Sequence, residues 1–298
     1  MTDETGWHTR RLRSALRERG FGSRCVDLAD CRFETTWSAH GLVIPGYGRG
    51  LPDGVIVRGI AGGSFEQVTL RLGILHALRE CSIPVYNDAR AIERSVDKAM
   101  TAFLLHRAGI ATPATWSGES AAVARRRVVR EAAAGREVVL KPLFGSQGKG
   151  LQRLGAAALP DLGPYGSVAH LQRFIPATSG HGFDWRIMVI GGEVVAAMRR
   201  EGAGWIHNAA QGARCVGADP PPGLIQLATR ACAALGLDYA GVDLVPDETA
   251  SAGARVIEVN GIAAWQKLQE ATGVDIAARL VDDLLRRKLP AAMTGCAA

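Results

Sequence analysis

Hydrophobic and polar positions alternate with two different periods along the chain, which predicts a mixture of helices and strands. Between residues 64 and 81 apolar side chains recur every three or four positions, as in an amphipathic helix. Further helices are expected over residues 10–20, 97–108, 119–134, 224–235 and 275–288. Strands are expected over residues 24–28, 41–44, 54–58, 83–87, 137–143, 169–175, 240–247 and 254–261. Two alternating runs meet at Gly191-Gly192 within residues 184–200, as in a hairpin, so the predicted class is α/β (α+β).

Two polar residues interrupt the apolar run at residues 254–261. Glu258 and Asn260 are two positions apart, so their side chains point to the same face of the expected strand. Asp243 lies inside the other apolar run, which we expect to form a neighbouring strand. Buried carboxylates are costly unless a cation accompanies them, and carboxylate and amide oxygens suit Mg²⁺. Two interpretations stay open: a magnesium site, or carboxylates that pair with arginines.

A glycine-rich segment follows the expected strand at residues 137–143. In KPLFGSQGKG, Lys141 precedes Gly145, Gly148 and Gly150. Glycines let the backbone approach phosphate oxygens, and lysines neutralise the phosphates. The order of residues matches neither a Walker loop nor a dinucleotide-binding fingerprint. Many hairpins contain similar segments, so the glycine-rich segment indicates a phosphate site only in combination with the other features.

A third polar group lies in and beyond the expected hairpin. Asp184 and Arg186 share one face of its first strand, and Asn208 and Arg214 follow the hairpin. Carboxylates, a glycine-rich loop and arginines together indicate a nucleotide site that stabilises charge on a transferred anionic group. No Ser/His/Asp or Cys/His arrangement suggests a covalent nucleophile.

Composition and charge restrict the remaining function classes. The chain has 298 residues, of which 47% are hydrophobic and 21% charged, with a net charge of +6, so a globular protein of one to three domains is expected. The arginine runs at residues 10–19 and 125–130 are typical of solvated helix faces. Nucleic-acid binding lacks a supporting motif, whereas a polyanionic small molecule suits the basic charge. Six scattered cysteines, no signal core and no membrane-spanning run favour a cytoplasmic protein.

Taken in order, seven segments resemble the ATP-grasp superfamily, and within it the RimK-like carboxylate–amine ligases. The resemblance spans residues 55–285 and rests on segments 90–116, 138–150, 170–176, 184–200, 208–214, 240–245 and 256–261. It implies an ATP-grasp fold with a pre-ATP-grasp domain (1–92), a central lid subdomain (93–171) and a C-terminal metal-binding subdomain (172–298). It also implies ATP and two Mg²⁺ ions as cofactors, with Mn²⁺ as an alternative metal.

The resemblance assigns roles residue by residue. ATP phosphates would contact Lys98 and Lys141, with Lys141 also near the adenine. The transferred phosphoryl group and acyl phosphate would contact Arg186, Asn208 and Arg214. The remaining assignments are the phosphate-covering loop Gly145, Ser146, Gln147 and Gly148; the adenine hinge Gln172, Arg173, Phe174 and Ile175; the ribose neighbour Asp184; and the magnesium ligands Asp243, Glu258 and Asn260.

The sequence departs from the family pattern at three places, one of which is Gly261-Ile262 after Asn260, where relatives often have Ser-Pro. Arg173 stands where relatives often carry an acidic hinge residue, although a backbone contact to adenine would survive that change. Gln211 replaces an arginine that would face phosphate, and Arg214 is placed to compensate. The exchange at Gln211 is the feature that favours a nucleotide-binding regulatory protein without turnover.

Within the family, residues 57–68 and 86–98 look most like glutamate ligases that act on tetrahydromethanopterin. The resemblance therefore implies ATP-dependent addition of L-glutamate, through an acyl phosphate, to a carboxylate-bearing small-molecule acceptor of this one-carbon coenzyme type. A ligase that modifies a protein tail or another coenzyme is the alternative enzyme. Arg58 and Ser64 are candidates for acceptor contact, with an ordinary turn as the alternative. No nucleic-acid or membrane partner is expected. The sequence leaves open whether the protein forms a homo-oligomer.

Overall fold

The N-terminal part of the chain forms a small α/β unit. The computed structural model describes residues 1–145, 148–155, 158–177, 182–208 and 212–289. Two short strand pairs, β1–β2 (antiparallel) and β3–β4 (parallel), lie beside helix α2 and share one apolar core with it. The elements of this part are α1 (Trp7–Glu18), η1 (Leu28–Asp30), β1 (Arg32–Phe33), β2 (Leu42–Val43), β3 (Val55–Ile56), α2 (Phe65–Glu80), β4 (Val85–Tyr86) and α3 (Ala89–Val96).

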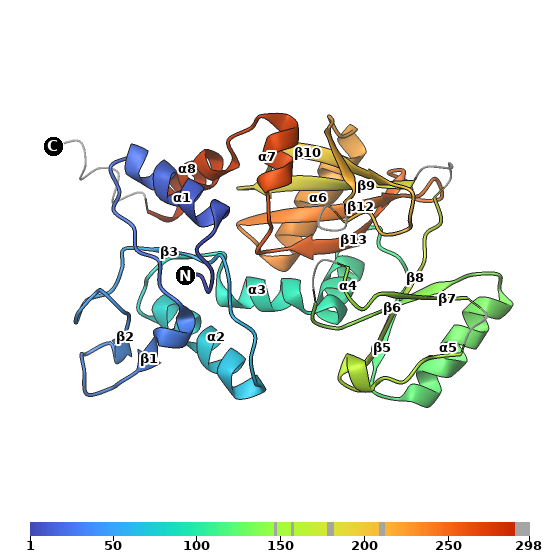
Figure 1. The fold of residues 1–298 in the computed structure, drawn as a ribbon, viewed down its shortest axis with the longest axis horizontal. Helices are drawn as coiled ribbons and strands as arrows, with labels where there is room; N and C mark the ends of the chain where they lie inside the picture. The colour runs from blue at the N-terminus through green and yellow to red at the C-terminus, as the bar shows by residue number, and fades with distance from the viewer. Residues whose placement is uncertain (146–147, 156–157, 178–181, 209–211, 290–298) are drawn as a thin grey trace.

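A central unit follows, built on a four-stranded antiparallel sheet in the order β5-β8-β6-β7. Helix α5 covers this sheet, and Val128, Leu140 and Leu171 form part of the core between them. In Figure 1 the unit extends to the lower right, in green. Its elements are α4 (Lys98–Arg107), β5 (Thr115–Gly118), α5 (Ala121–Ala133), β6 (Val138–Lys141), β7 (Gln152–Leu154), η2 (Gly163–Tyr165) and β8 (Ala169–Arg173).

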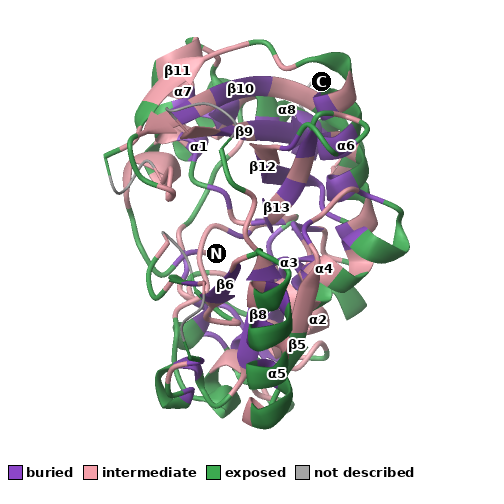
Figure 2. Ribbon diagram, turned by 90° about the vertical axis from the view of Figure 1, so that its right-hand side faces the viewer, coloured by how far each residue is buried: buried purple, intermediate pink, exposed green. Residues whose placement is uncertain are grey.

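The C-terminal part is a five-stranded antiparallel sheet, ordered β11-β10-β9-β12-β13, with helices on both faces. Helix α6 packs on one face through residues such as Leu227 and Leu235. Helices α7, α8 and α1 cover the other, and Figure 2 shows the buried strands between these layers. The elements are β9 (Gly182–Ile190), β10 (Glu193–Gly202), β11 (Arg214–Gly217), α6 (Pro222–Leu235), β12 (Tyr239–Pro246), β13 (Ala254–Asn260), α7 (Gln266–Thr272) and α8 (Ile276–Lys288).

Helix α1 belongs spatially to the C-terminal part although it begins the chain. Its apolar residues Leu12 and Ala15 join the core around α8, and Arg19 forms an ion pair with Asp282. Helix α1 therefore packs against helix α8 of the C-terminal part. No helix in the described ranges is long and apolar enough to cross a membrane.

The structure corrects one element expected from sequence. Residues 24–28 do not form a strand: the carbonyl of Val26 accepts a hydrogen bond from the backbone of Thr2, and Asp27 then caps the 3₁₀ helix η1 through the backbone NH of Ala29. An Asp side chain that bonds the backbone two residues ahead favours a turn over an extended strand. Helices α3 and α7 and strands β1, β5, β7 and β11 were not among the elements expected from the apolar pattern.

Candidate active site

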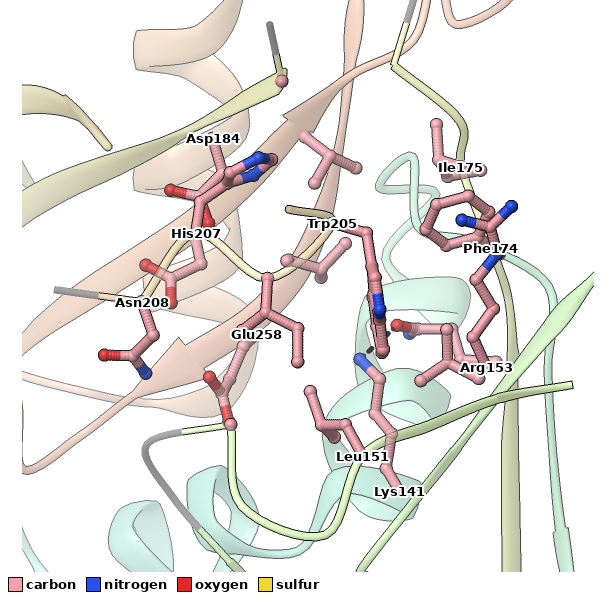
Figure 3. Close-up of a pocket in the computed structure, with 18 of the residues that line it drawn as sticks. Lys141, Leu151, Arg153, Phe174, Ile175, Asp184, Trp205, His207, Asn208 and Glu258 are labelled. Carbon is pink, nitrogen blue, oxygen red and sulfur yellow. Dashed lines mark hydrogen bonds between the residues drawn. The ribbon is translucent and has the colours of Figure 1, made fainter. Parts of the chain in front are cut away.

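One cavity of about 540 Å³ lies between the central sheet and the C-terminal sheet. Figure 3 shows side chains from both units projecting into it, with Lys141 and Phe174 on the side of the central unit and Asp184 and Glu258 on the other. The structure brings these sequence-predicted residues together on its wall: Lys98, Lys141, Gly145, Gly148, Gln172, Arg173, Phe174, Ile175, Asp184, Asn208, Asp243 and Glu258. Residues far apart in the sequence thus meet around one space.

Two lysines enter the cavity from different elements. Asp97 caps helix α4 by accepting hydrogen bonds from the backbone NH groups of Ala99 and Met100, which fixes Lys98 at the first helical turn. The Lys98 ammonium donates to the carbonyl of Gly145 at 2.7 Å. Lys141 ends β6 and donates to the side-chain oxygen of Gln172 at 2.6 Å. Burial lowers the pKa of both lysines, that of Lys141 to about 8.

The segment from Gln172 to Ile175 connects the central unit to the C-terminal unit. Arg173 donates two hydrogen bonds to the buried carboxylate of Glu131 on α5, at 2.9 and 3.2 Å. Glu131 also accepts from Arg136 at 2.8 Å. The guanidinium of Arg173 is therefore held against α5 by these hydrogen bonds. This ion pair gives a structural reason for a basic residue at position 173.

A network of buried charges forms the opposite wall of the cavity. Asp243 on β12 lies opposite Arg186 on β9, and Arg186 holds both of its oxygens. Arg200 on β10 donates to both oxygens of Asp184 at 2.6 and 2.8 Å, and also contacts Asp243 at 3.1 Å. Burial opposes ionisation of Asp243, but the two arginines hold its pKa below its usual value. The predicted alternative, a carboxylate that pairs with arginines, is thus realised at Asp243.

Glu258 has fewer charged partners than Asp243 in the described part of the chain. The two residues lie opposite each other on β13 and β12, and both line the cavity. Lys98 is 3.8 Å from the Glu258 carboxylate. Asn260 donates to the carbonyl of Gly241 at 3.3 Å and is not among the described residues that line the cavity. Within the described ranges no cluster of three or more His, Cys, Asp and Glu side chains is placed to hold a metal by itself.

These residues fit a magnesium ion that also binds substrate phosphates. Mg²⁺ commonly takes one or two carboxylates from the protein and completes its coordination with phosphate oxygens and water. Glu258 supplies a carboxylate at this wall, Asp243 beside it would exchange an arginine contact for the metal, and the cavity has room for the phosphates beside them. A third acidic ligand is not needed for this arrangement.

Several predicted residues lie elsewhere. Arg186 reaches Asp243 but does not itself line the described cavity, and Arg214 is exposed at the start of β11. Ser64 caps α2 in a capping box with Gln67. Arg58 donates to the carbonyl of Ala263 at 2.9 Å and lies over the Trp265 ring at 4.3 Å, which links the N-terminal and C-terminal parts. Ser146, Gln147 and Gln211 lie outside the described residues.

Arg200 and Trp205 are among the residues of the site that the sequence analysis missed. Arg200 shares a strand face with Ala196 and Met198, and a charge that continues a buried apolar face signals a buried partner. Trp205, between β10 and β11, lines the cavity and has its ring centroid 5.9 Å from that of Phe174. A large aromatic residue in a segment of small residues was the available signal for it.

The fold and the cavity together define an ATP-grasp protein. Residues 95–284 match the RimK-like ATP-grasp domain, and residues 1–92 match the RimK PreATP-grasp domain. The chain belongs to the RimK-like ATP-grasp family. This confirms the family and the fold that the sequence motifs predicted.

Named relatives extend over most of the chain. The tetrahydromethanopterin:alpha-L-glutamate ligase of Methanosarcina acetivorans is 29% identical over 329 residues, covering 95% of this chain and 97% of the relative. The protein of the same name from Methanococcus maripaludis is 34% identical over 210 residues, covering 68% and 70%. Among solved structures, the ATP-grasp ligase PsnB, complexed with a phosphomimetic variant of a minimal precursor, Mg and ADP, has a TM-score of 0.72 at 20% identity, covering 96% and 97%. At that identity the likeness supports the fold alone.

Proposed function

We propose that this protein is an ATP-dependent carboxylate–amine ligase that adds L-glutamate to a small-molecule acceptor of the tetrahydromethanopterin type. Membership of the RimK-like family supports the ligase class, and the names of two relatives support glutamate and this acceptor. The observation that carries the proposal is the convergence of Lys98, Lys141, Asp243 and Glu258 on one cavity. Two cations and two carboxylates in one space suit a polyphosphate with its metal.

The proposed reaction has two steps. An oxygen of the acceptor carboxylate attacks the γ-phosphorus of ATP, the bond to the ADP oxygen breaks, and an acyl phosphate forms. The amine nitrogen of L-glutamate then attacks the acyl carbon, phosphate leaves with the bonding electron pair, and the nitrogen loses a proton to solvent. The products are an amide, ADP and phosphate, and no covalent enzyme intermediate is required.

The chain's own side chains would bind and neutralise the reacting groups. Lys98 and Lys141 supply positive charge to the phosphates from the side of the central unit. Asp243 and Glu258, with Asn260 next along β13, would hold the proposed pair of magnesium ions. When bound, these ions would offset negative charge on the phosphates.

We assign stabilisation of the negative charge on the acyl phosphate to the network of Arg186 and Arg200. Arg200 lines the cavity, and Arg186 stands one strand away with its guanidinium fixed on Asp243. Side chains held by ion pairs are already oriented before charge develops, which is the condition for effective electrostatic stabilisation. Asn208 lies on the same wall and is assigned to the transferred group. Arg214 lies outside the cavity and receives no step.

The test is release of ADP with Mg-ATP and L-glutamate across a panel of carboxylate acceptors led by tetrahydromethanopterin-type pterins, with product mass followed. The proposal predicts ADP release that depends on both glutamate and a pterin acceptor, and a product heavier by one glutamyl unit. Turnover only with a peptide tail or a deazaflavin coenzyme would replace the acceptor and keep the ligase. Nucleotide binding without turnover on any acceptor would favour the regulatory alternative.

A further inference from the structure

Trp205 is an aromatic side chain of the cavity to which neither the motifs nor the proposed chemistry assigns a role. It belongs to the segment between β10 and β11, next to the small residues Ala203 and Gly204. Figure 3 shows its indole projecting into the cavity, with Phe174 and Ile175 on one side and Asn208 and Glu258 on the other. The indole therefore stands between the connecting segment and the charged wall.

The indole is supported by a chain of ring contacts. Its centroid lies 5.9 Å from that of Phe174, with the two ring planes at 87°. The Arg153 guanidinium packs over the same phenyl ring at 4.1 Å. Edge-to-face and cation–π contacts of this kind orient aromatic rings as well as stabilise them. Trp205 thus joins the C-terminal unit to the central unit at this end of the cavity.

The two ends of the cavity differ in chemistry in the same way as the two ends of a nucleotide. Ile175 follows Phe174 in the connecting segment and Val139 lies opposite Gln172 in the central sheet, whereas the other end carries Asp184 and Glu258. The volume of about 540 Å³ remains with the indole in place, so a ligand can enter without displacing it. An aromatic wall beside an apolar space is suited to a flat base.

From this geometry we infer that Trp205 forms a stacking wall for the nucleobase, supplied by the C-terminal unit opposite the connecting segment. The inference rests on the proposed ATP-dependent reaction and adds a residue that determines nucleotide affinity. Stacking uses the π face that every base presents, so the contribution depends on an aromatic side chain and not on the indole NH.

The test is calorimetric titration of Mg-ADP into the full chain and three variants. Trp205→Ala should bind about tenfold more weakly, because base–aromatic stacking is lost, while Trp205→Phe should stay within about threefold of the parent protein. Trp37→Ala is the matched control: its indole donates to the carbonyl of Gly48 in the N-terminal part, outside the cavity, and its loss should leave affinity unchanged. Circular dichroism melting should show that every variant is folded.

Each outcome decides the inference separately from the proposed function. If the parent protein binds no Mg-ADP, the proposed function fails and the stacking role falls with it. If the parent binds and Trp205→Ala binds equally well, only the stacking role is overturned. Equal weakening by Phe and Ala would also overturn it, because stacking requires only a ring. As a second readout, saturating Mg-ADP should change the tryptophan fluorescence of the parent protein, and Trp205→Phe should lack that change.

Discussion

Asp243 and Glu131 are both buried carboxylates held by two arginines, yet they have different surroundings. Asp243, held by Arg186 and Arg200, forms part of the cavity wall. Glu131, held by Arg136 and Arg173, lies on helix α5 and is not among the described residues of that wall. The chemical groups are the same, so the difference in role comes from position: one cluster faces the space where substrate would bind, and the other ties a helix to the connecting segment.

The largest expected difference in stability between the two clusters comes from removing Arg200. Arg200→Met should leave Asp184 without the partner of both its oxygens and lower the free energy of unfolding by about 3–5 kcal/mol, measured by urea denaturation. Arg136→Met is the control, because Arg136 is half-exposed and Glu131 keeps Arg173, so a much smaller loss of unfolding free energy is expected. Equal losses in the two variants would contradict the distinction between the clusters.

The next effect separates stability from binding. Glu131→Gln removes a buried carboxylate from two arginines and should cost about 1–3 kcal/mol of unfolding free energy. Its affinity for Mg-ATP should stay within about threefold of the parent protein, since the carboxylate lies outside the cavity. Calorimetry and urea denaturation on the same preparation measure both. A large loss of affinity at unchanged stability would place Glu131 with the catalytic cluster.

The smallest effect is a pH dependence on the cavity side. Because burial lowers the pKa of Lys141 to about 8, its ammonium loses its proton as the pH rises above that value, and phosphates then lose a positive partner. Affinity for Mg-ATP should therefore fall between pH 7 and pH 9, by about tenfold for one lost charge contact. Lys141→Met should bind weakly at both pH values, and its pH profile should be flatter. A parent profile as flat as that of the variant would contradict the assignment.

Sequence pattern predicted the parts of this architecture that depend on local periodicity. The hairpin at residues 184–200 and the strand carrying Glu258 follow from alternation, and both lie where expected, with the turn at Gly191-Gly192. The prediction of a strand at residues 24–28 was wrong, because an apolar residue beside Asp27 is also compatible with a capped turn. The local pattern does not show which hydrogen-bond partner the backbone finds. The prediction that Lys98 and Lys141 share one site came from the family motifs and not from periodicity.

The partners of charged residues were the part that sequence could not supply. Arg173 finds Glu131 42 residues away, and Arg200 finds Asp184 through the register of two antiparallel strands. Such choices depend on strand order and helix placement, which are set by the whole core. Trp205 was missed for a related reason: the path of an irregular segment is fixed by its contacts across the cavity, not by its own residues.

The most direct test of the central claim is calorimetric binding of Mg-ATP to the parent protein, Glu258→Ala and Glu131→Gln. The claim is that the carboxylates on the cavity wall hold a metal-bound triphosphate. It predicts tight binding by the parent protein and by Glu131→Gln, and binding by Glu258→Ala that is at least about tenfold weaker and less dependent on Mg²⁺. Absence of binding by the parent protein, or identical Mg²⁺-dependent binding by Glu258→Ala, would contradict it.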